Sequence, residues 1–374
     1  MTPPNINDTL SAISNMKEDF ISYLIMMVII AILIALIVYI FYLRRLKSSE
    51  CDYMKDLYES IDGYIRPLDI NDPDCSGNLY DYYIKTAYNA CSGGNYKNDF
   101  VDVCNLKSVI GQGVRCLDFE LYSIDDKPIV ATSTSDSYYI KETFNYVDFN
   151  DVMKTIQNYA FASSTAPNYT DPILINLRIM SNNQTMYTNL ANILASYEDM
   201  LLSKENSFEN NGKNIAGLPI TSFMNKCLII VDKTNTAFLD NEEFLEYVNL
   251  TSNSVFMRSY HYNDIKDNPD VDELTNFNRR GMTIVYPEVG TNPDNPSGIL
   301  CREYGCQMVA MRFQFVDDLL EENTLFFDRC TYAFCLKPER LRYVPVTIPL
   351  PDPQNPEYSY ATRKVESDYY SFDV

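Results

Sequence analysis

The stretch GVRCLDFELYSIDDKPIVATSTSD, residues 113–136, opens with an apolar run, GVRCLDFELY, that predicts a β-strand. Asp118 and Glu120 lie two positions apart within this run. Because successive side chains of a strand point to opposite faces of a sheet, the two carboxylates share one face. They are the strongest candidate in the chain for a functional pair.

Similar apolar runs recur on both sides of this stretch and alternate with amphipathic segments. We predict strands at 172–180, 227–232, 282–287 and 305–315, and helices at 149–161 and 186–202. Alternating strands and helices indicate a parallel sheet wrapped by helices. About 270 residues with this rhythm are typical of a (β/α)8 barrel, so the predicted fold class is α/β.

An uncharged apolar segment, YLIMMVIIAILIALIVYIFYL, occupies residues 23–43. At about 1.5 Å per residue it matches a hydrocarbon core about 30 Å thick, which predicts a transmembrane helix at 21–43. A secretory signal would be shorter and would end at a small-residue cleavage site, so we predict an uncleaved anchor. Arg44, Arg45 and Lys47 follow the helix, and the positive-inside rule then predicts a single-pass protein with its barrel in the cytosol.

The composition also changes along the rest of the chain. Residues 203–226 are polar and divide the barrel sequence unequally, which is typical of a linker. After Arg342, a Pro-rich, acidic, Tyr-rich tail lacks helical or strand periodicity. The predicted parts are an N-terminal polar segment (1–20), the transmembrane helix (21–43), a tether (44–79), two half barrels (80–202 and 227–342), the linker between them (203–226) and the tail (343–374).

The overall charge restricts the partners. Acidic residues outnumber basic ones 51 to 30, for a net charge of −21. This excess repels phosphate-rich surfaces, so we expect no nucleic-acid partner. Tyr, Asn, Asp and Ile are abundant while Gly and Trp are scarce, which indicates an AT-rich coding source such as a large DNA virus. A viral origin would add the virion membrane to the candidates for the membrane that the helix crosses.

Histidine occurs once, at His261, which excludes any mechanism that needs one imidazole as base and another as acid. His261 lies in the polar stretch RSYHYND, and we interpret it as a surface or locally bonded residue rather than a catalyst. The ten cysteines could form five bridges, but none sits in a CxxC pair. Most are predicted to be buried thiols, and a zinc site is disfavoured.

Several motifs of the predicted barrel resemble those of one enzyme family. The C-terminal half contains VYPEVG (285–290), YGCQMVAMRFQF (304–315) and LFFDRCTYAFCLKPERLR (325–342), and the N-terminal half contains IKTAYNACSG (84–93), GVRCLDFELYSIDDKPIV (113–130) and NYAFASSTAPNYTDPILINLRI (158–179). Together they resemble the X and Y halves of the eukaryotic-type phosphoinositide-specific phospholipases C. The resemblance implies a distorted TIM barrel that cleaves phosphatidylinositol lipids with two His residues and calcium.

The resemblance places both catalytic His positions on other residues. The first His of the family falls on Tyr88 and the second on Thr132. A phenol with a pKa near 10 is a poor base at neutral pH, and the hydroxyls of Ser133, Thr134 and Ser135 have no neighbouring base to activate them. No catalytic residue is therefore expected to be intact.

The resemblance also implies a changed metal site. The family's Asn ligand falls on Asn89, its two acidic ligands fall on Asp118 and Glu120, and its last carboxylate falls on Arg178. A guanidinium repels a calcium ion, so we expect no metal cofactor and a salt bridge from Arg178 to Asp118 or Glu120. Two alternatives remain: a loose metal site at the two carboxylates, and a phosphate bound by Arg178 as in some prokaryotic relatives.

The head-group positions of the family are only partly kept. They fall on Lys233, Ser259 and Tyr286, while an Arg of the family falls on Ile284. One cation is too few for several phosphates, because each charge-assisted contact contributes only about 1.5 to 3 kcal/mol. Selective binding of polyphosphoinositides is therefore not expected.

Three functional interpretations follow from these residues. The first is a membrane-anchored, catalytically degenerate phospholipase C-like barrel that serves as a binding or structural module for protein partners that the sequence does not identify. The second is an active phosphoric diester hydrolase with an altered, calcium-independent mechanism. The third is a protein that binds phosphatidylinositol in the vestigial pocket.

Overall fold

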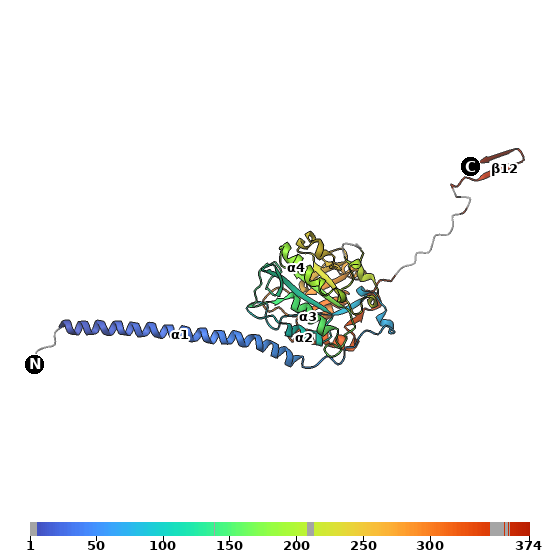
Figure 1. Ribbon diagram of the computed structural model, residues 1–374. Helices are drawn as coiled ribbons and strands as arrows, with labels where there is room; N and C mark the ends of the chain where they lie inside the picture. The colour runs from blue at the N-terminus through green and yellow to red at the C-terminus, as the bar shows by residue number, and fades with distance from the viewer. Residues whose placement is uncertain (1–5, 138, 208–212, 345–354, 356–357, 359) are drawn as a thin grey trace, which may run out of the picture. The chain divides into compact units, whose positions relative to one another are not determined.

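Figure 1 shows the computed structural model, which describes residues 6–137, 139–207, 213–344, 355, 358 and 360–374. The chain divides into two units, residues 1–342 and residues 343–374. The first unit contains the long helix α1 (Ile6–Leu57) and a barrel. The second contains an antiparallel pair of strands, β12 (Lys364–Ser367) and β13 (Tyr370–Asp373).

Eight parallel strands form a nearly closed barrel, which confirms the predicted fold class. The strand order is β7-β6-β5-β2-β1-β10-β9-β8, and each neighbouring pair in this order is parallel. The bounds of these strands are β1 Tyr82–Ala87, β2 Cys116–Ile124, β5 Ile173–Ile179, β6 Cys227–Asp232, β7 Leu250–Ser252, β8 Met257–His261, β9 Met282–Tyr286 and β10 Met308–Met311. Three further strands pair antiparallel off this order: β3 (Lys127–Ala131) with β2, β4 (Val147–Asp148) with β3, and β11 (Phe334–Leu336) with β1.

Helices follow most of the strands and cover the outside of the barrel (Figure 1). Both helices predicted from the sequence are present, although the second ends earlier, at Ala195, and a short 3-10 turn follows it. Asp102 and Asn183 cap two of these helices by accepting hydrogen bonds from backbone N–H groups. The bounds are α2 Val103–Gly111, α3 Phe149–Ala160, α4 Gln184–Ala195, α6 Glu242–Leu245, α7 Tyr262–Lys266, α8 Val271–Asn278, α9 Gly298–Glu303 and α10 Asp318–Cys330.

Side-chain alternation along β2 separates two apolar cores. Leu117 and Phe119 pack outward against the helices, in a cluster that includes Ile156 of α3. Cys116 packs inward with apolar residues of the other strands, such as Leu174 of β5. Because Asp118 and Glu120 follow Cys116 at even spacing, they share its inward face. The strand thus brings two carboxylates into the centre of the barrel.

Helix α1 is long and apolar enough over Phe20–Leu57 to cross a membrane, as predicted, although a signal sequence has the same features. The helix does not end at residue 43 but continues to Leu57, where Met54 is fully buried against the barrel. Further along the predicted tether, Ile65 and Leu68 are buried among apolar residues of the barrel, whereas Tyr64 and Ile70 are exposed. Residues 44–79 therefore belong largely to the fold.

Two other segments also differ from their predictions. In the predicted linker 203–226, of which residues 208–212 lie outside the described residues, Ile215, Ile220 and Phe223 are buried in the inner core. In the predicted aperiodic tail, residues 364–373 form the β12–β13 hairpin. Apolar Val365 and Phe372 face each other across this hairpin, a local pairing that the polar composition hid.

A disulfide joins the end of α1 to the barrel. Cys51 bonds to Cys104 of α2, and Lys47 forms an ion pair with Asp102 at 3.0 Å. A second disulfide joins Cys330 to Cys335. The other six cysteines are free and buried, which confirms that most are buried thiols. Disulfides are typical of oxidising compartments and thus argue against a cytosolic barrel, so its orientation stays a prediction.

The cysteine pattern can be checked by alkylation and mass spectrometry. Because buried thiols and disulfides both resist alkylation, we expect almost no labelling of the native protein. After unfolding without reductant, the six free cysteines should react, and after reduction all ten should react. Labelling of all ten cysteines without reductant would contradict the two disulfides.

Candidate functional site

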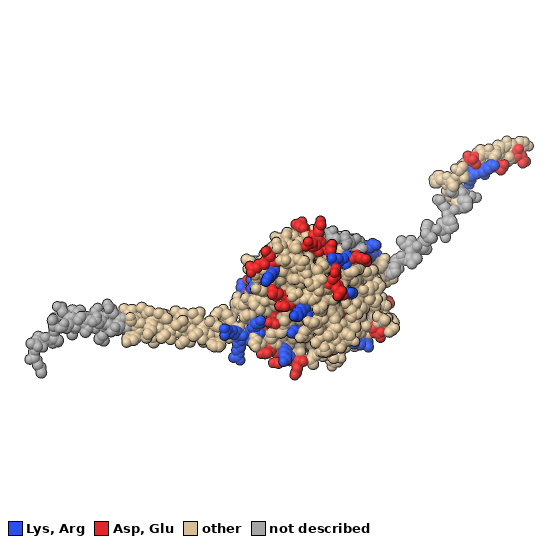
Figure 2. Space-filling model, in the orientation of Figure 1, with Lys and Arg blue, Asp and Glu red and all other residues tan. Residues whose placement is uncertain are grey.

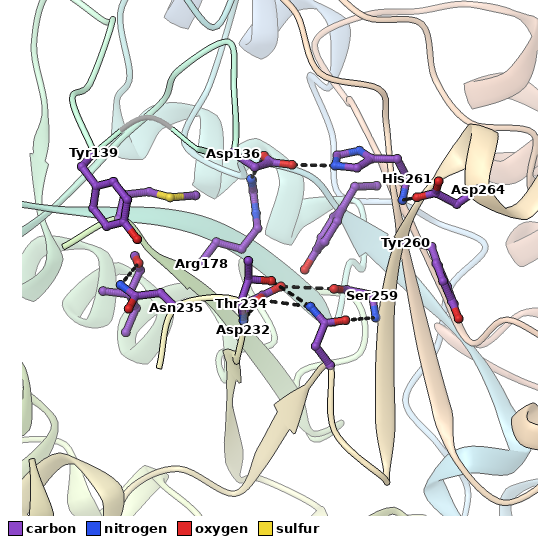
Figure 3. Close-up of a pocket in the computed structure, with 14 residues that line it drawn as sticks. Asp136, Tyr139, Arg178, Asp232, Thr234, Asn235, Ser259, Tyr260, His261 and Asp264 are labelled. Carbon is purple, nitrogen blue, oxygen red and sulfur yellow. Dashed lines mark hydrogen bonds and ion pairs between the residues drawn. The ribbon is translucent and has the colours of Figure 1, made fainter. Parts of the chain in front are cut away.

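A cavity of about 270 Å³ opens at the carboxyl ends of the barrel strands (Figure 3). Its walls come from the ends of β5, β6, β8 and β9 and from the loop that follows β3. In α/β barrels this end of the sheet is where active sites lie. The residues that matter most for its chemistry are Asp136, Arg178, Asp232, Ser259, His261 and Tyr286.

Arg178 of β5 is buried and bonded to both inward-facing carboxylates of β2. Its Nε and Nη2 atoms donate to the two oxygens of Asp118 at 3.0 and 2.8 Å. Its Nη1 atom lies 3.0 Å from Oε1 of Glu120, which is its register partner across the β2–β5 pair. The fork of the guanidinium suits this bidentate pairing with a carboxylate. The salt bridge expected from the sequence therefore includes both carboxylates.

Asn89 completes the surroundings of the two carboxylates. It adopts a φ of 45°, a left-handed conformation that Asn tolerates better than most residues. Its backbone N–H donates to Asp118 at 3.1 Å and its Nδ2 donates to Glu120 at 2.9 Å. Its own Oδ1 accepts from Arg178 at 3.1 Å. The four residues predicted to form a vestigial site are thus in mutual contact.

These residues do not fit a calcium ion in this arrangement. Calcium is held by six to eight oxygen ligands that face a common centre. Here the oxygens of Asp118 and Glu120 face the guanidinium of Arg178, the amide of Asn89 and other protein donors such as Tyr122. The carboxylate oxygens that could hold an ion are thus already paired with a permanent cation.

Two tyrosine rings lie against the Arg178 guanidinium. Its central carbon is 4.6 Å from the ring centre of Tyr88 and 5.0 Å from that of Tyr286, within the range of cation–π contacts. Burial raises the pKa of the Tyr88 hydroxyl well above its usual value. The residue at the first catalytic position is therefore even less able to act as a base than a free phenol.

Thr132, on which the resemblance places the second His of the family, does not line the cavity. Its hydroxyl donates to the backbone carbonyl of Tyr96 at 3.0 Å, and its side chain is buried. The donor is thus used for a structural hydrogen bond at the end of β3.

The predicted head-group residues are only partly brought together. Ser259 and Tyr286 line the cavity, and the Ser259 hydroxyl donates to Asp232 at 3.2 Å. Lys233 follows Asp232 in sequence but does not line the cavity. Strand β6 ends at Asp232 and the chain turns at Lys233, so the expected cation is not part of the cavity wall.

His261 lies in the cavity wall, where sequence analysis did not place it. Its Nε2 atom is 2.5 Å from Oδ2 of Asp136, and its Nδ1 atom is 2.6 Å from the carbonyl oxygen of Pro287. The hydrogen bond to Asp136 raises the pKa of the His261 imidazole. The imidazole is thus bonded, but not locally: Asp136 is 125 residues away in sequence, so no local signal predicted the pair.

The fold is similar to that of solved phospholipases C. The L. pealei PLC21 crystal structure matches with a TM-score of 0.57 at 21% identity, over 72% of this chain and 38% of that chain. The S. officinalis PLC21 structure matches with a TM-score of 0.56, at the same identity and coverage. At this identity the similarity shows the fold alone, and the chain spans well under half the length of either protein.

A calcium-dependent phosphoinositol-specific phospholipase C from Pseudomonas sp. is more distant, with a TM-score of 0.42 at 12% identity. Comparison with curated proteins gives no match. The family model "Phosphatidylinositol-specific phospholipase C, X domain" matches residues 75–233, which span the strands that carry Asn89, Asp118, Glu120 and Arg178. The family resemblance read from the sequence motifs is therefore confirmed for residues 75–233, which are similar to the X domain of the phosphatidylinositol-specific phospholipases C.

Proposed function

We propose that the protein is a catalytically inert, membrane-anchored phospholipase C-like barrel that serves as a binding or structural module. The observation that carries this proposal is the position of the Arg178 guanidinium, which lies between Asp118 and Glu120 and contacts Asn89. The barrel keeps the fold of the enzyme family, but the centre of its cavity is occupied by ion pairs between Arg178 and two carboxylates.

The exclusion of calcium is supported by the charges involved. At a separation of about 4 Å and an effective dielectric near 20, two unit charges interact with about 4 kcal/mol, and a divalent ion doubles this cost beside Arg178. The two carboxylates cannot offset the cost, because they already pair with the guanidinium. An ion would have to displace Arg178 from a buried position, which leaves its charge unpaired.

The residues of the cavity wall support the absence of a catalytic acid and base pair. His261 is the only imidazole of the chain, and both its nitrogens are bonded to acceptors, so neither is free to take a proton from a substrate. Tyr88 is buried and has a raised pKa. A hydrolase with an altered mechanism would need other groups in these two roles.

The charge of the surface also supports a role other than binding of polyphosphoinositides. Asp136, Asp232 and Asp264 line the cavity together with two cationic residues, Arg178 and His261. On the face drawn in Figure 2, acidic and basic side chains are interspersed over the barrel, and a group of basic side chains lies where the long helix meets it. A strongly anionic head group would be repelled by this surface.

Lipid hydrolysis is the direct test of this proposal. We expect the full chain, reconstituted in detergent with phosphatidylinositol or its bisphosphate, to release no inositol phosphate in either calcium or chelator. Release that requires calcium would overturn the proposal of an inert site. Release that persists in chelator would instead support the altered, calcium-independent hydrolase.

Exchange of Arg178 for a carboxylate tests its role as a substitute for the ion. We expect Arg178→Asp to lower the free energy of unfolding by about 3 to 5 kcal/mol in chelator, because it leaves buried carboxylates without their cation. Calcium should then raise the melting temperature of this variant, because a third carboxylate restores an oxygen-rich site. The measurement is thermal unfolding with and without calcium.

Arg258→Asp is the matched control. Arg258 pairs with Glu273 at 2.7 Å and does not line the cavity. Its melting temperature should not respond to calcium. A calcium response of the unmodified protein would show that the ion binds beside Arg178 and would contradict the proposal.

A further inference from the structure

The disulfide at the end of α1 lies in a group of side chains that could also hold a metal ion. The sulfur atoms of Cys51 and Cys104 and a carboxylate oxygen of Asp102 all lie within 4.8 Å of one another. Cys51 comes from α1, whereas Asp102 and Cys104 come from the start of α2. The sequence disfavoured a zinc site because no CxxC pair occurs, but the fold brings together two cysteines that are 53 residues apart.

These three side chains match the ligands that zinc prefers. Zinc binds thiolates and also accepts a carboxylate, and three protein ligands plus a water molecule are a known tetrahedral set. The Asp102 carboxylate keeps lone pairs for a metal. Its Oδ1 accepts from the backbone N–H of Cys104 at 3.0 Å, its Oδ2 lies 3.0 Å from Nζ of Lys47, and each oxygen can accept one bond more.

Lys47 supplies the charge that balances such a site. Two thiolates and a carboxylate exceed the charge of Zn²⁺ by one negative charge. The Lys47 ammonium is already paired with Asp102 and neutralises this excess. Partners of this kind, which hold a ligand without touching the metal, orient the ligand and strengthen metal binding.

The group is accessible to a reductant and to an ion. Cys51, Asp102 and Cys104 are all partly exposed, whereas the six free cysteines are buried. A cavity of about 300 Å³ is lined by Lys47, Asp102 and residues of α3 such as Lys154. Exposed disulfides are the ones that thiols reduce most readily. Both states of this cysteine pair are therefore within reach of solvent.

We propose that Cys51, Cys104 and Asp102 form a redox-controlled zinc site, which replaces the disulfide as the link between α1 and α2 when the chain is reduced. A dithiol reductant cleaves the S–S bond and is itself oxidised to a disulfide, which leaves two thiols on the protein. Binding of Zn²⁺ then releases both thiol protons to solvent. The proposal does not depend on the inert barrel, because these residues do not line its cavity.

The two states suit different compartments. Disulfides persist in oxidising compartments and are reduced in the cytosol. The barrel orientation predicted by the positive-inside rule would therefore expose this disulfide to reduction. A metal ion bound to the same residues would keep the end of α1 attached to the barrel, and because it binds only the folded junction it would stabilise that junction by mass action.

Cobalt(II) is a coloured substitute for zinc and allows a direct test. The full chain in phosphatidylcholine nanodiscs is titrated with Co²⁺, both oxidised and after reduction by a phosphine that is then removed without oxygen. We expect the reduced chain to bind one Co²⁺ with thiolate charge-transfer and tetrahedral ligand-field absorption, and the oxidised chain to show neither. Zinc should displace the cobalt and remove the absorption.

Three variants assign the signal to these residues. Cys51→Ser should lose the charge-transfer absorption. Asp102→Asn should bind Co²⁺ about tenfold more weakly, because Asn still caps α2 but offers no charge to the metal. Cys330→Ser is the matched control, because it opens the other disulfide and should keep the absorption of the reduced, unmodified chain.

No absorption in the reduced chain, or its persistence in Cys51→Ser, would overturn the proposal. If Cys51→Ser does not fold, alkylation of the reduced, unmodified chain decides, with the labelled sites located by mass spectrometry. Zinc must then protect Cys51 and Cys104 but not Cys330 and Cys335, and equal labelling with and without zinc refutes the site. Because none of these measurements involves lipid hydrolysis, failure here would leave the inert barrel intact.

Discussion

The pairing of one guanidinium with two buried carboxylates is the constraint around which the centre of this barrel is arranged. Arg178 contributes from β5, Asp118 and Glu120 contribute from β2, and Asn89 reaches both carboxylates from the end of β1. A buried charge is tolerated only when it is paired and hydrogen-bonded, so none of these residues can change alone without leaving a partner uncompensated. Tyr88 and Tyr286 pack against the guanidinium, so the positions of these two rings also depend on Arg178.

This arrangement lies at the centre of a barrel with the phospholipase C fold. The strands, their order and the cavity at their carboxyl ends follow the phospholipase C fold, because a close-packed core preserves a fold independently of its active site. The charges in the cavity are instead used within the protein, where Asp136 joins Arg178 to His261. Nearer the N-terminus, the disulfide between Cys51 and Cys104 attaches the barrel to the end of the apolar helix. The Asp136 contacts and the disulfide each hold together segments that are far apart in the sequence.

The fold was predictable where the sequence pattern was regular. The alternation of buried strands and amphipathic helices identified the barrel, and the spacing of Asp118 and Glu120 placed both on its inward face. Prediction was weaker where polar residues hide a few apolar contacts. Ile65 and Leu68 pack into the barrel from a segment expected to be a tether, and the hairpin at 364–373 depends on pairing between residues of low overall hydrophobicity.

The sequence by itself determined which groups are available: one imidazole in the whole chain, a cation at Arg178, two carboxylates at Asp118 and Glu120, and an apolar helix before the barrel. Only the tertiary structure decided which groups meet. Asp136 and His261 are far apart along the chain and lie on a loop and a strand end, whose relative positions depend on closure of the barrel rather than on local periodicity. The side chain of Lys233 does not line the cavity, and this too could not be read from the sequence, because its direction depends on where β6 ends.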